Sequence, residues 1–197
     1  MASNIDTAIP PFGNATTAGV RANFAAAKAE IEELQNNHGF VDYNDAATGV
    51  TPINVLANTW TKLTNDKLGP YTKEDQLPGA VTRVWDTATN QFKFDELPLN
   101  TTMDGRFDLQ ITTTANNQVV DLSAFVAIGA PLAFEFPLMT SALFKTAGTY
   151  KINAFNGMYV GSNDVKNYPT EIKLRSDAAC TVRVNGWYVR IVIPSGV

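Results

Sequence analysis

Cysteine and histidine are nearly absent from this sequence of 197 residues, which contains one of each, Cys180 and His38. A single cysteine cannot form an internal disulfide, and no cluster of cysteine and histidine has the spacing of a zinc site. Nucleophilic catalysis needs a base beside the nucleophile, and these two residues stand far apart without a flanking signature. We therefore expect no disulfide, no metal, no cofactor and no catalytic residue.

An excess of positive charge is also missing. The 15 lysine and arginine residues are outnumbered by 19 aspartate and glutamate residues, which gives a formal net charge of -4 and a sequence pI near 4.9. Proteins that bind a phosphate backbone carry a basic surface, so nucleic acid is not an expected partner. No apolar run reaches the length of a membrane span, so we expect no membrane insertion. The pattern of a secretory signal is also missing, so we expect none.

Helical periodicity occurs once, in residues 16–38. A threonine can cap the start of this helix, alanines favour it, and Asn36, Asn37 and Gly39 end it. Its apolar residues follow the heptad spacing of a coiled coil, which is narrower than the stripe of an ordinary surface helix. This heptad seam consists of Val20, Phe24, Ala27, Ile31 and Leu34.

A helix of this length should fray on its own, because burying a few apolar side chains does not offset the entropy of ordering about 20 residues. Three arrangements would stabilise it: packing on its own domain, self-association into a short bundle, or docking on a larger partner. The strict heptad spacing favours self-association. Bulky Phe24 and Ile31 at one seam position and small Ala27 at the other do not fix the number of helices in the bundle.

The segment before the helix, residues 1–15, has no periodicity. Its two prolines force an extended path, and its apolar residues have no local partner. We interpret this segment as an extended tail that docks on a larger particle, the alternative being a tail that folds back on its own oligomer. The candidate docking residues are Ile5, Ile9, Pro10, Pro11 and Phe12.

The composition changes after the helix. Residues 39–58 are polar and are interpreted as a connector. In residues 59–197, short β-prone runs alternate with Gly, Pro, Asn and Asp, which is the pattern of an antiparallel sandwich or barrel. The expected fold class is therefore mainly β, preceded by an extended tail and a helix. The expected strands are residues 59–63, 80–85, 91–94, 107–113, 119–128, 133–138, 149–155, 158–161, 171–175 and 181–193.

Three of the expected strands also predict which faces are buried and where the chain turns. In RFDLQIT every second residue from Phe107 is apolar, as in a strand with one buried face. In VVDLSAFVAI a complete apolar face is joined by Val119 and Phe125 on the other face, which indicates a subunit contact or a covering loop. The run CTVRVNGWYVRIVI changes phase at Asn185 and Gly186, where a tight hairpin is the default interpretation and a bulge the alternative.

The loop GSNDVKNYP, residues 161–169, combines amide, carboxylate and phenol groups that can bind sugar hydroxyls and stack on a sugar ring. A polar sandwich loop is the simpler interpretation. The tryptophans could likewise form a sugar platform, but a tryptophan in a β-run is usually a core residue. The candidate glycan residues are Asn163, Asp164, Asn167 and Tyr168, and the tryptophans are Trp60, Trp85 and Trp187.

A glycosidase needs only two carboxylates, so counting alone does not exclude one. Pairs such as Asp108 with Asp121, or Asp95 with Glu96, are available. Nothing in their spacing selects any of them, and acidic side chains on strand faces are ordinarily solvated. We expect a protein that is not an enzyme.

The opening IPPFGNATTAGVRANFAAAKAEIEELQ, a proline-rich tail followed by a helix, resembles the N-terminal attachment module of small virion structural proteins of tailed bacteriophages. Later stretches resemble their C-terminal domains, and together the similar stretches cover most of the chain. These later stretches are NTWTKLTND, FDLQITTTANNQVVDLSAFVAIG, FKTAGTYKINAFNGMYVG and LRSDAACTVRVNGWYVRIVI.

This resemblance implies an architecture and a role. Such C-terminal domains are similar to the jelly rolls of the tumour-necrosis-factor and complement type, which associate as trimers. The chain is then expected to form a homotrimeric appendage on the outer surface of a phage virion, docked through its N-terminus on a capsid or tail protein. The chain lacks the long shaft of a typical tail fibre, which favours a short head fibre or capsid decoration spike. The alternatives are a tail-associated receptor-binding fibre that recognises a host surface glycan and, less favoured, a capsule depolymerase.

Overall fold

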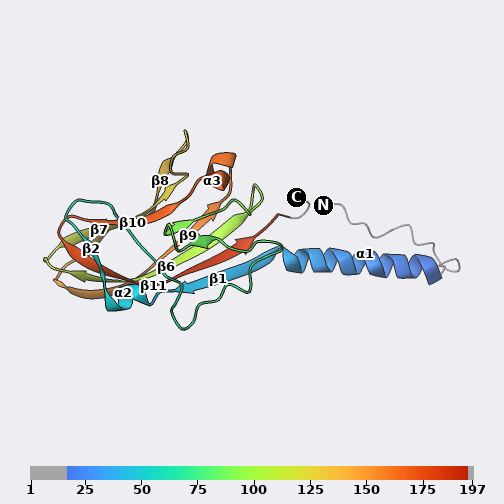
Figure 1. Ribbon diagram of the computed structural model, residues 1–197, viewed down its shortest axis with the longest axis horizontal. Helices are drawn as coiled ribbons and strands as arrows, with labels where there is room; N and C mark the ends of the chain where they lie inside the picture. The colour runs from blue at the N-terminus through green and yellow to red at the C-terminus, as the bar shows by residue number, and fades with distance from the viewer. Residues whose placement is uncertain (1–16, 195–197) are drawn as a thin grey trace.

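The structure is a computed structural model that describes residues 17–194, except for the side chains of residues 17 and 33–36. A β-sandwich follows one long helix (Figure 1). The elements are α1 (Thr17–Asn36), β1 (His38–Asn44), α2 (Ala47–Val50), β2 (Ile53–Val55), β3 (Thr61–Lys62), β4 (Trp85–Asp86), β5 (Gln91–Phe92), β6 (Thr102–Thr113), β7 (Gln118–Val126), β8 (Phe134–Phe144), β9 (Gly148–Tyr159), α3 (Asn163–Asn167), β10 (Glu171–Ser176) and β11 (Cys180–Val192).

Two antiparallel sheets form the sandwich. The first has the order β1-β11-β6-β9, with β2 also paired to β11, and the second has the order β3-β10-β7-β8. When these eight main strands are counted along the chain, the first pairs with the eighth, the second with the seventh, the third with the sixth and the fourth with the fifth. This nested pairing is the topology of a jelly roll. The prediction of a mainly β, antiparallel sandwich is confirmed.

The core lies between the two sheets and follows from the alternation of side chains along the strands. In β6, Phe107 and Leu109 are fully buried, as the pattern of that run predicts. An aromatic cluster fills the centre, where the ring of Trp85 lies edge-on to Phe92 at 4.8 Å and to Trp187 at 6.1 Å. The short hairpin of β4 and β5 thus completes the core from one side.

The predicted hairpin at Asn185 and Gly186 is wrong, and the alternative of a bulge is correct. Strand β11 runs through both residues, and its register with β6 shifts by one residue between Val184 and Gly186. Gly186 pairs with Asn44 of β1 on one side and with Asp108 of β6 on the other. Strand β1 ends opposite Gly186, but β6 pairs with β11 on both sides of this point. The phase change therefore leaves one residue of β11 unpaired instead of forming a turn.

The predicted connector, residues 39–58, contains structure that the sequence analysis did not identify. Strand β1 forms an edge of the first sheet, and α2 and β2 follow it. Val41 and Tyr43 of β1 are fully buried. The expected strand at residues 80–85 contributes only its last residue to β4, since the chain before it forms a long loop around the edge of β1.

The second apolar face of β7 is covered from within the chain at Phe125. The ring of Trp60 lies edge-on to Phe125 at 5.2 Å, and the ammonium group of Lys173 lies 4.5 Å from the centre of the same ring. The covering-segment interpretation is therefore correct at this residue.

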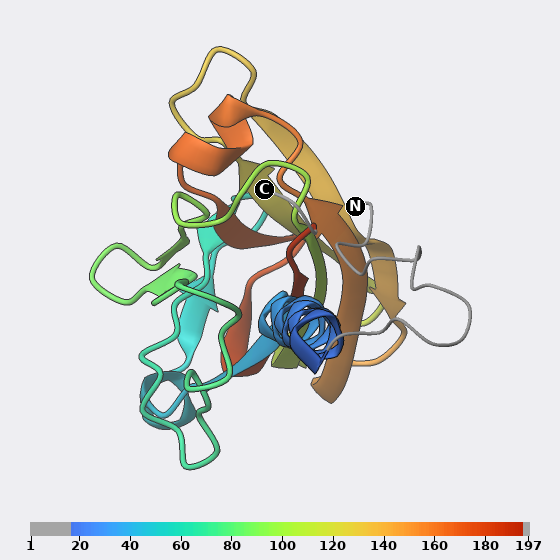
Figure 2. The ribbon, with the colours of Figure 1, turned by 90° about the vertical axis from the view of Figure 1, so that its right-hand side faces the viewer.

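Helix α1 projects from the end of the sandwich along the direction of β1 (Figure 1). In Figure 2, which looks along the helix, it points toward the viewer in front of the strands. One residue, Asn37, separates the end of α1 from the start of β1. No helix among residues 17–194 is long and apolar enough to cross a membrane.

Candidate functional sites

The first candidate site is the heptad seam on α1. Because the helix projects from the sandwich, its apolar side chains face water: Phe24 is 72% exposed and Ile31 is 55% exposed. Val20 is also exposed and Ala27 is half-buried, while the side chain of Leu34 lies outside the described part of the chain. The seam is therefore an apolar stripe that the described sandwich does not cover.

The five candidate docking residues all lie in residues 1–16, outside the residues that the structure describes. These residues are Ile5, Ile9, Pro10, Pro11 and Phe12. Their role stays a prediction.

The second candidate site is the loop that contains α3. The side chain of Ser162 accepts a hydrogen bond from the amide of Val165 at 3.3 Å and caps this short helix. The carboxylate of Asp164 accepts a hydrogen bond from the amide of Leu132 at 3.3 Å, which ties α3 to the β7–β8 connection. Asn163 is exposed. The contacts of Ser162 and Asp164 therefore stabilise the loop itself.

Asn167 and Tyr168, in contrast, line a cleft of about 670 Å³. The structure thus separates the four predicted glycan residues, with only these two at the cleft. Both are exposed at its rim. The remaining lining comes from two segments distant in sequence, and comprises Lys67, Glu74, Thr82, Arg83, Trp85, Asp86, Thr87, Lys93 and Asp95 together with Lys166.

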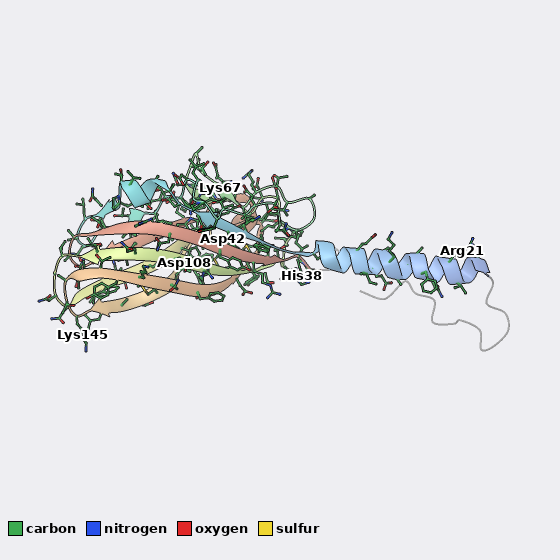
Figure 3. The ribbon with its side chains drawn as sticks, turned by 90° about the horizontal axis from the view of Figure 1, so that it is seen from below. Arg21, His38, Asp42, Lys67, Asp108 and Lys145 are labelled. Carbon is green, nitrogen blue, oxygen red and sulfur yellow. The ribbon has the colours of Figure 1, made fainter. Side chains whose placement is uncertain are left out.

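Backbone hydrogen bonds hold these segments together. Phe92 and Thr170 exchange two backbone hydrogen bonds, at 2.8 and 3.0 Å, which fix the end of the α3 loop beside β5. The amide of Lys93 donates to the carbonyl of Val84 at 2.9 Å and joins both sides of the β4–β5 hairpin. The cleft therefore has a floor of β-structure, with loops from three parts of the chain as its walls. Lys67, labelled in Figure 3, lies in one of these loops at the flank of the sandwich.

Two of the basic side chains in the cleft are neutralised by acidic ones. Lys67 pairs with Glu74 at 2.7 Å, and Glu74 also accepts a hydrogen bond from the hydroxyl of Tyr43 at 2.7 Å. Arg83 pairs with Asp95 at 3.0 Å. These two ion pairs form part of the cleft walls and contribute little net charge to the cleft.

Asp86 and Lys93 lie on the hairpin itself. A hydrogen bond from the hydroxyl of Thr89 is the largest cause that lowers the pKa of Asp86, and the positive charge of Lys93 contributes to the same lowering. Within the described residues, neither Lys93 nor Lys166 forms an ion pair or a side-chain hydrogen bond. Lys93 therefore lies near the charge of Asp86 without forming an ion pair with it, and Lys166 has no ion-pair partner among the described residues.

The tryptophans do not form a sugar platform. Trp85 and Trp187 are fully buried in the core, and Trp60 packs on Phe125. The core interpretation is confirmed for the first two.

The carboxylate pairs considered from the sequence do not form a shared site. Asp108 on β6 pairs with Arg106 at 2.9 Å, and Asp121 on β7 pairs with Arg175 at 2.9 Å. These two strands belong to different sheets, and both carboxylates point away from the core between buried neighbours. The two groups accordingly lie on opposite outer faces of the sandwich.

Asp95 and Glu96 are adjacent and both lie near Arg83, at 3.0 and 3.9 Å. Burial tends to raise the pKa of Glu96, but hydrogen bonds from Thr82 and Arg83 outweigh burial and lower the pKa below its usual value. A general acid needs a raised pKa, so Glu96 is poorly suited to that role.

Sequence reasoning found one wall of the cleft and missed the other two. The α3 loop stands out because polar and aromatic residues are concentrated between two strands. Lys93 and the residues before β4 have no such signal, since their proximity to α3 depends on the pairing of Phe92 with Thr170. That pairing joins positions almost 80 residues apart, which no local pattern specifies.

No protein-family model matches this chain, and no curated protein sequence matches it. Solved structures with similar backbones include Eiger TNF from S. frugiperda, with 8% identity and a TM-score of 0.42, covering 82% of this chain and 96% of that one. The PRD1 vertex protein P5 has 13% identity and a TM-score of 0.35, covering 81% and 98%. A chain of infectious bursal disease virus, Gt strain, has 7% identity and a TM-score of 0.44, covering 82% of this chain.

This chain spans about a third of the length of that infectious bursal disease virus chain, 33%. At these identities and TM-scores, the jelly-roll assignment rests on the strand pairing described above and not on the similarities.

Proposed function

We propose that this chain is a structural protein of a tailed-phage virion, a homotrimeric head fibre or capsid decoration spike. The N-terminal tail docks on a capsid or tail protein, the α1 helices form a bundle, and the jelly rolls face outward from the particle. The role is not enzymatic, and it involves neither nucleic acid nor insertion into a membrane. The sequence resemblance and the projecting, apolar α1 support this proposal.

The observation that carries the proposal is the exposure of Phe24 and Ile31 on a helix that projects away from its own domain. Burying each of these side chains in a bundle would contribute about 1.5 to 3 kcal/mol. An isolated helix of this length is marginal in water. Association of several chains through the seam removes the apolar stripe from water and supplies the packing that a single α1 lacks.

Trimerisation would also strengthen attachment to the particle. Each trimer presents three copies of the tail, so the first docked tail raises the effective concentration of the other two. Docking peptides that bind weakly one at a time then hold the appendage firmly. The apolar residues of the tail, Ile5, Ile9 and Phe12, supply the contacts in this proposal.

A second candidate function is a tail-associated fibre that recognises a glycan on the host surface. The cleft lined by Asn167 and Tyr168 favours it, because a concave site with convergent polar groups and an aromatic rim suits a sugar. A glycan array with the full chain distinguishes this function from a purely structural decoration.

Cross-linking of matched variants tests the seam. Phe24→Asp introduces a charge into the seam, whereas Ala29→Asp introduces the same charge at an exposed position on the opposite face of α1. We expect Phe24→Asp to reduce the cross-linked oligomer and the helix content, because a buried unpaired charge is costly. Ala29→Asp should leave both close to the unchanged protein. Equal cross-linking and helix content in all three proteins would refute the seam assignment.

A further inference from the structure

We propose that the cleft beside α3 binds an acidic saccharide, with a carboxylate of the sugar held by Lys93 and Lys166. This inference rests on the second candidate function and gives its ligand a chemical class. It does not depend on how the α1 helices associate.

The size and construction of the cleft suit a ligand site. Its volume of about 670 Å³ lies within the range of about 300 to 1,000 Å³ that is usual for ligand clefts. Its floor is the β4–β5 hairpin, which the bond from Lys93 to Val84 closes and the two bonds between Phe92 and Thr170 fix beside the start of β10. A site on such a floor keeps its shape without a ligand, so binding loses little conformational entropy.

The charges of the cleft select an anion. Its lining has four basic side chains and three acidic ones, in a chain with a net charge of -4. Lys67 and Arg83 are already paired with acidic residues. Lys93 and Lys166 are half-buried and form no ion pair among the described residues, and the carboxylate of Asp86 acts on Lys93 only through its nearby charge. Partial burial costs a cation some of its hydration. A carboxylate of the ligand would replace that hydration by accepting hydrogen bonds from both ammonium groups.

The other lining groups favour a sugar over a phosphate. Thr87 and Asn167 offer both donors and acceptors, which is what ring hydroxyls need, and the hydroxyl of Thr82, which donates to Glu96 at 2.8 Å, can still accept. Tyr168 presents an aromatic ring at the rim, where an apolar sugar face can pack. A dianionic phosphate would meet the negative charge of Asp86 close by, while a single carboxylate carries half that charge.

Calorimetric titration of the full chain tests this proposal. The probes are tetragalacturonate, its fully methyl-esterified form, sialyllactose, lactose and inorganic phosphate. Tetragalacturonate and its methyl ester share one skeleton and differ in charge. Sialyllactose differs from lactose by one acidic sugar. We expect tetragalacturonate or sialyllactose to bind at least tenfold more tightly than its neutral counterpart and more tightly than phosphate.

Variants locate the site. Lys93→Ala and Lys166→Ala should each weaken binding of the acidic probe at least fivefold. Lys145→Ala is the matched control, because Lys145 is an exposed lysine at the end of the sandwich far from α1 (Figure 3) and does not line the cleft. This control should bind like the unchanged protein.

Three results would overturn the proposal: no binding of either acidic saccharide, equal binding of the neutral counterparts, or unchanged affinity in both lysine variants. Tighter binding of phosphate would assign the cleft to a phosphate-bearing ligand and overturn it as well. Light scattering on the same samples keeps this test separate from the structural role, since loss of saccharide binding with an unchanged oligomer mass concerns the cleft alone.

Discussion

The hydroxyl of Thr48 in α2 accepts a hydrogen bond from the amide of Val184 in β11 at 2.8 Å. Strand β1 pairs with residues 186–192 of β11 and β2 with residues 180–182, so Val184 lies in the gap between its two partner strands. Thr48 fills that gap, and its hydroxyl also donates to the buried carboxylate of Asp45 at 2.5 Å. The side chain of Thr48 thereby gives the backbone amide beside the bulge its hydrogen-bond partner.

Replacing Thr48 with valine should lower the free energy of unfolding by about 1 to 3 kcal/mol, the cost of leaving a buried hydrogen-bonding group unpaired. The substitution keeps the shape of the side chain but leaves the buried amide of Val184 without its acceptor. Urea unfolding at a fixed protein concentration measures the loss. Thr48→Ser keeps the hydroxyl and should retain most of the stability; if the two variants unfold at the same urea concentration, the hydrogen bond has no role of its own.

Gly39 allows the long loop between β3 and β4 to approach β1 closely. A Cβ at this position would overlap the carbonyl oxygen of Gln76 and lie 2.7 Å from the Cδ of Pro78. The same carbonyl accepts a hydrogen bond from the amide of Phe40 at 2.9 Å, which covers the edge of β1. The loop cannot keep this bond and also make room for a methyl group.

Gly39→Ala should therefore destabilise the protein by about 1 to 3 kcal/mol, as overpacking against backbone does. Gly148→Ala is the control, because a Cβ there meets its nearest neighbour, the ring of Tyr150, at 3.8 Å, an ordinary contact. Hydrogen exchange of the Phe40 amide should accelerate in the first variant only. Unchanged exchange and stability in Gly39→Ala would mean that the loop does not need this close approach.

Glu171 joins three strands through its carboxylate. It pairs with Lys62 of β3 at 2.7 Å and with Lys173 of β10 at 2.9 Å, and it accepts a hydrogen bond from Gln91 of β5 at 2.9 Å. Burial tends to raise its pKa, but these three donors outweigh burial and lower the pKa of Glu171 to about 2.

A folded-state pKa below the unfolded value means that the carboxylate stabilises the fold above the unfolded pKa, ordinarily about 4.3. The contribution is lost as pH falls from there toward about 2. Glu171→Gln should lower the free energy of unfolding by about 1 to 3 kcal/mol at pH 7, and the difference from the unchanged protein should shrink in that acidic window.

Thermal unfolding at pH 7 and in the acidic window measures this difference. Asp75→Asn, at an exposed carboxylate of the long loop, is the control and should change stability little at either pH. A gap between Glu171→Gln and the unchanged protein that stays constant with pH would contradict the role of the Glu171 carboxylate.

The predictable parts of the fold are those with a local pattern. The alternation around Phe107 and Leu109 specifies a strand with one buried face, and the structure agrees. The phase change at Gly186 was misinterpreted because a hairpin and a bulge have the same local sequence. Which one forms depends on whether β6 pairs with β11 on both sides of this point, and that pairing joins residues distant in the chain.

Strand β1 shows a missed signal of a different kind. Val41 and Tyr43 alternate with Phe40 and Asp42, and this short pattern could have identified the strand. Its position directly after a helix and its polar surroundings concealed it. In the cleft, the α3 loop with Lys166 was predictable from composition, but Lys93 becomes a neighbour of that loop only through the tertiary fold.

The mass of the full chain in solution tests the central claim of an oligomeric appendage most directly. Light scattering at several concentrations should give about three times the chain mass of 21.4 kDa. Another whole multiple of the chain mass, constant with concentration, would support association through the heptad seam but contradict a trimer. A mass of 21.4 kDa at every concentration would contradict the bundle itself.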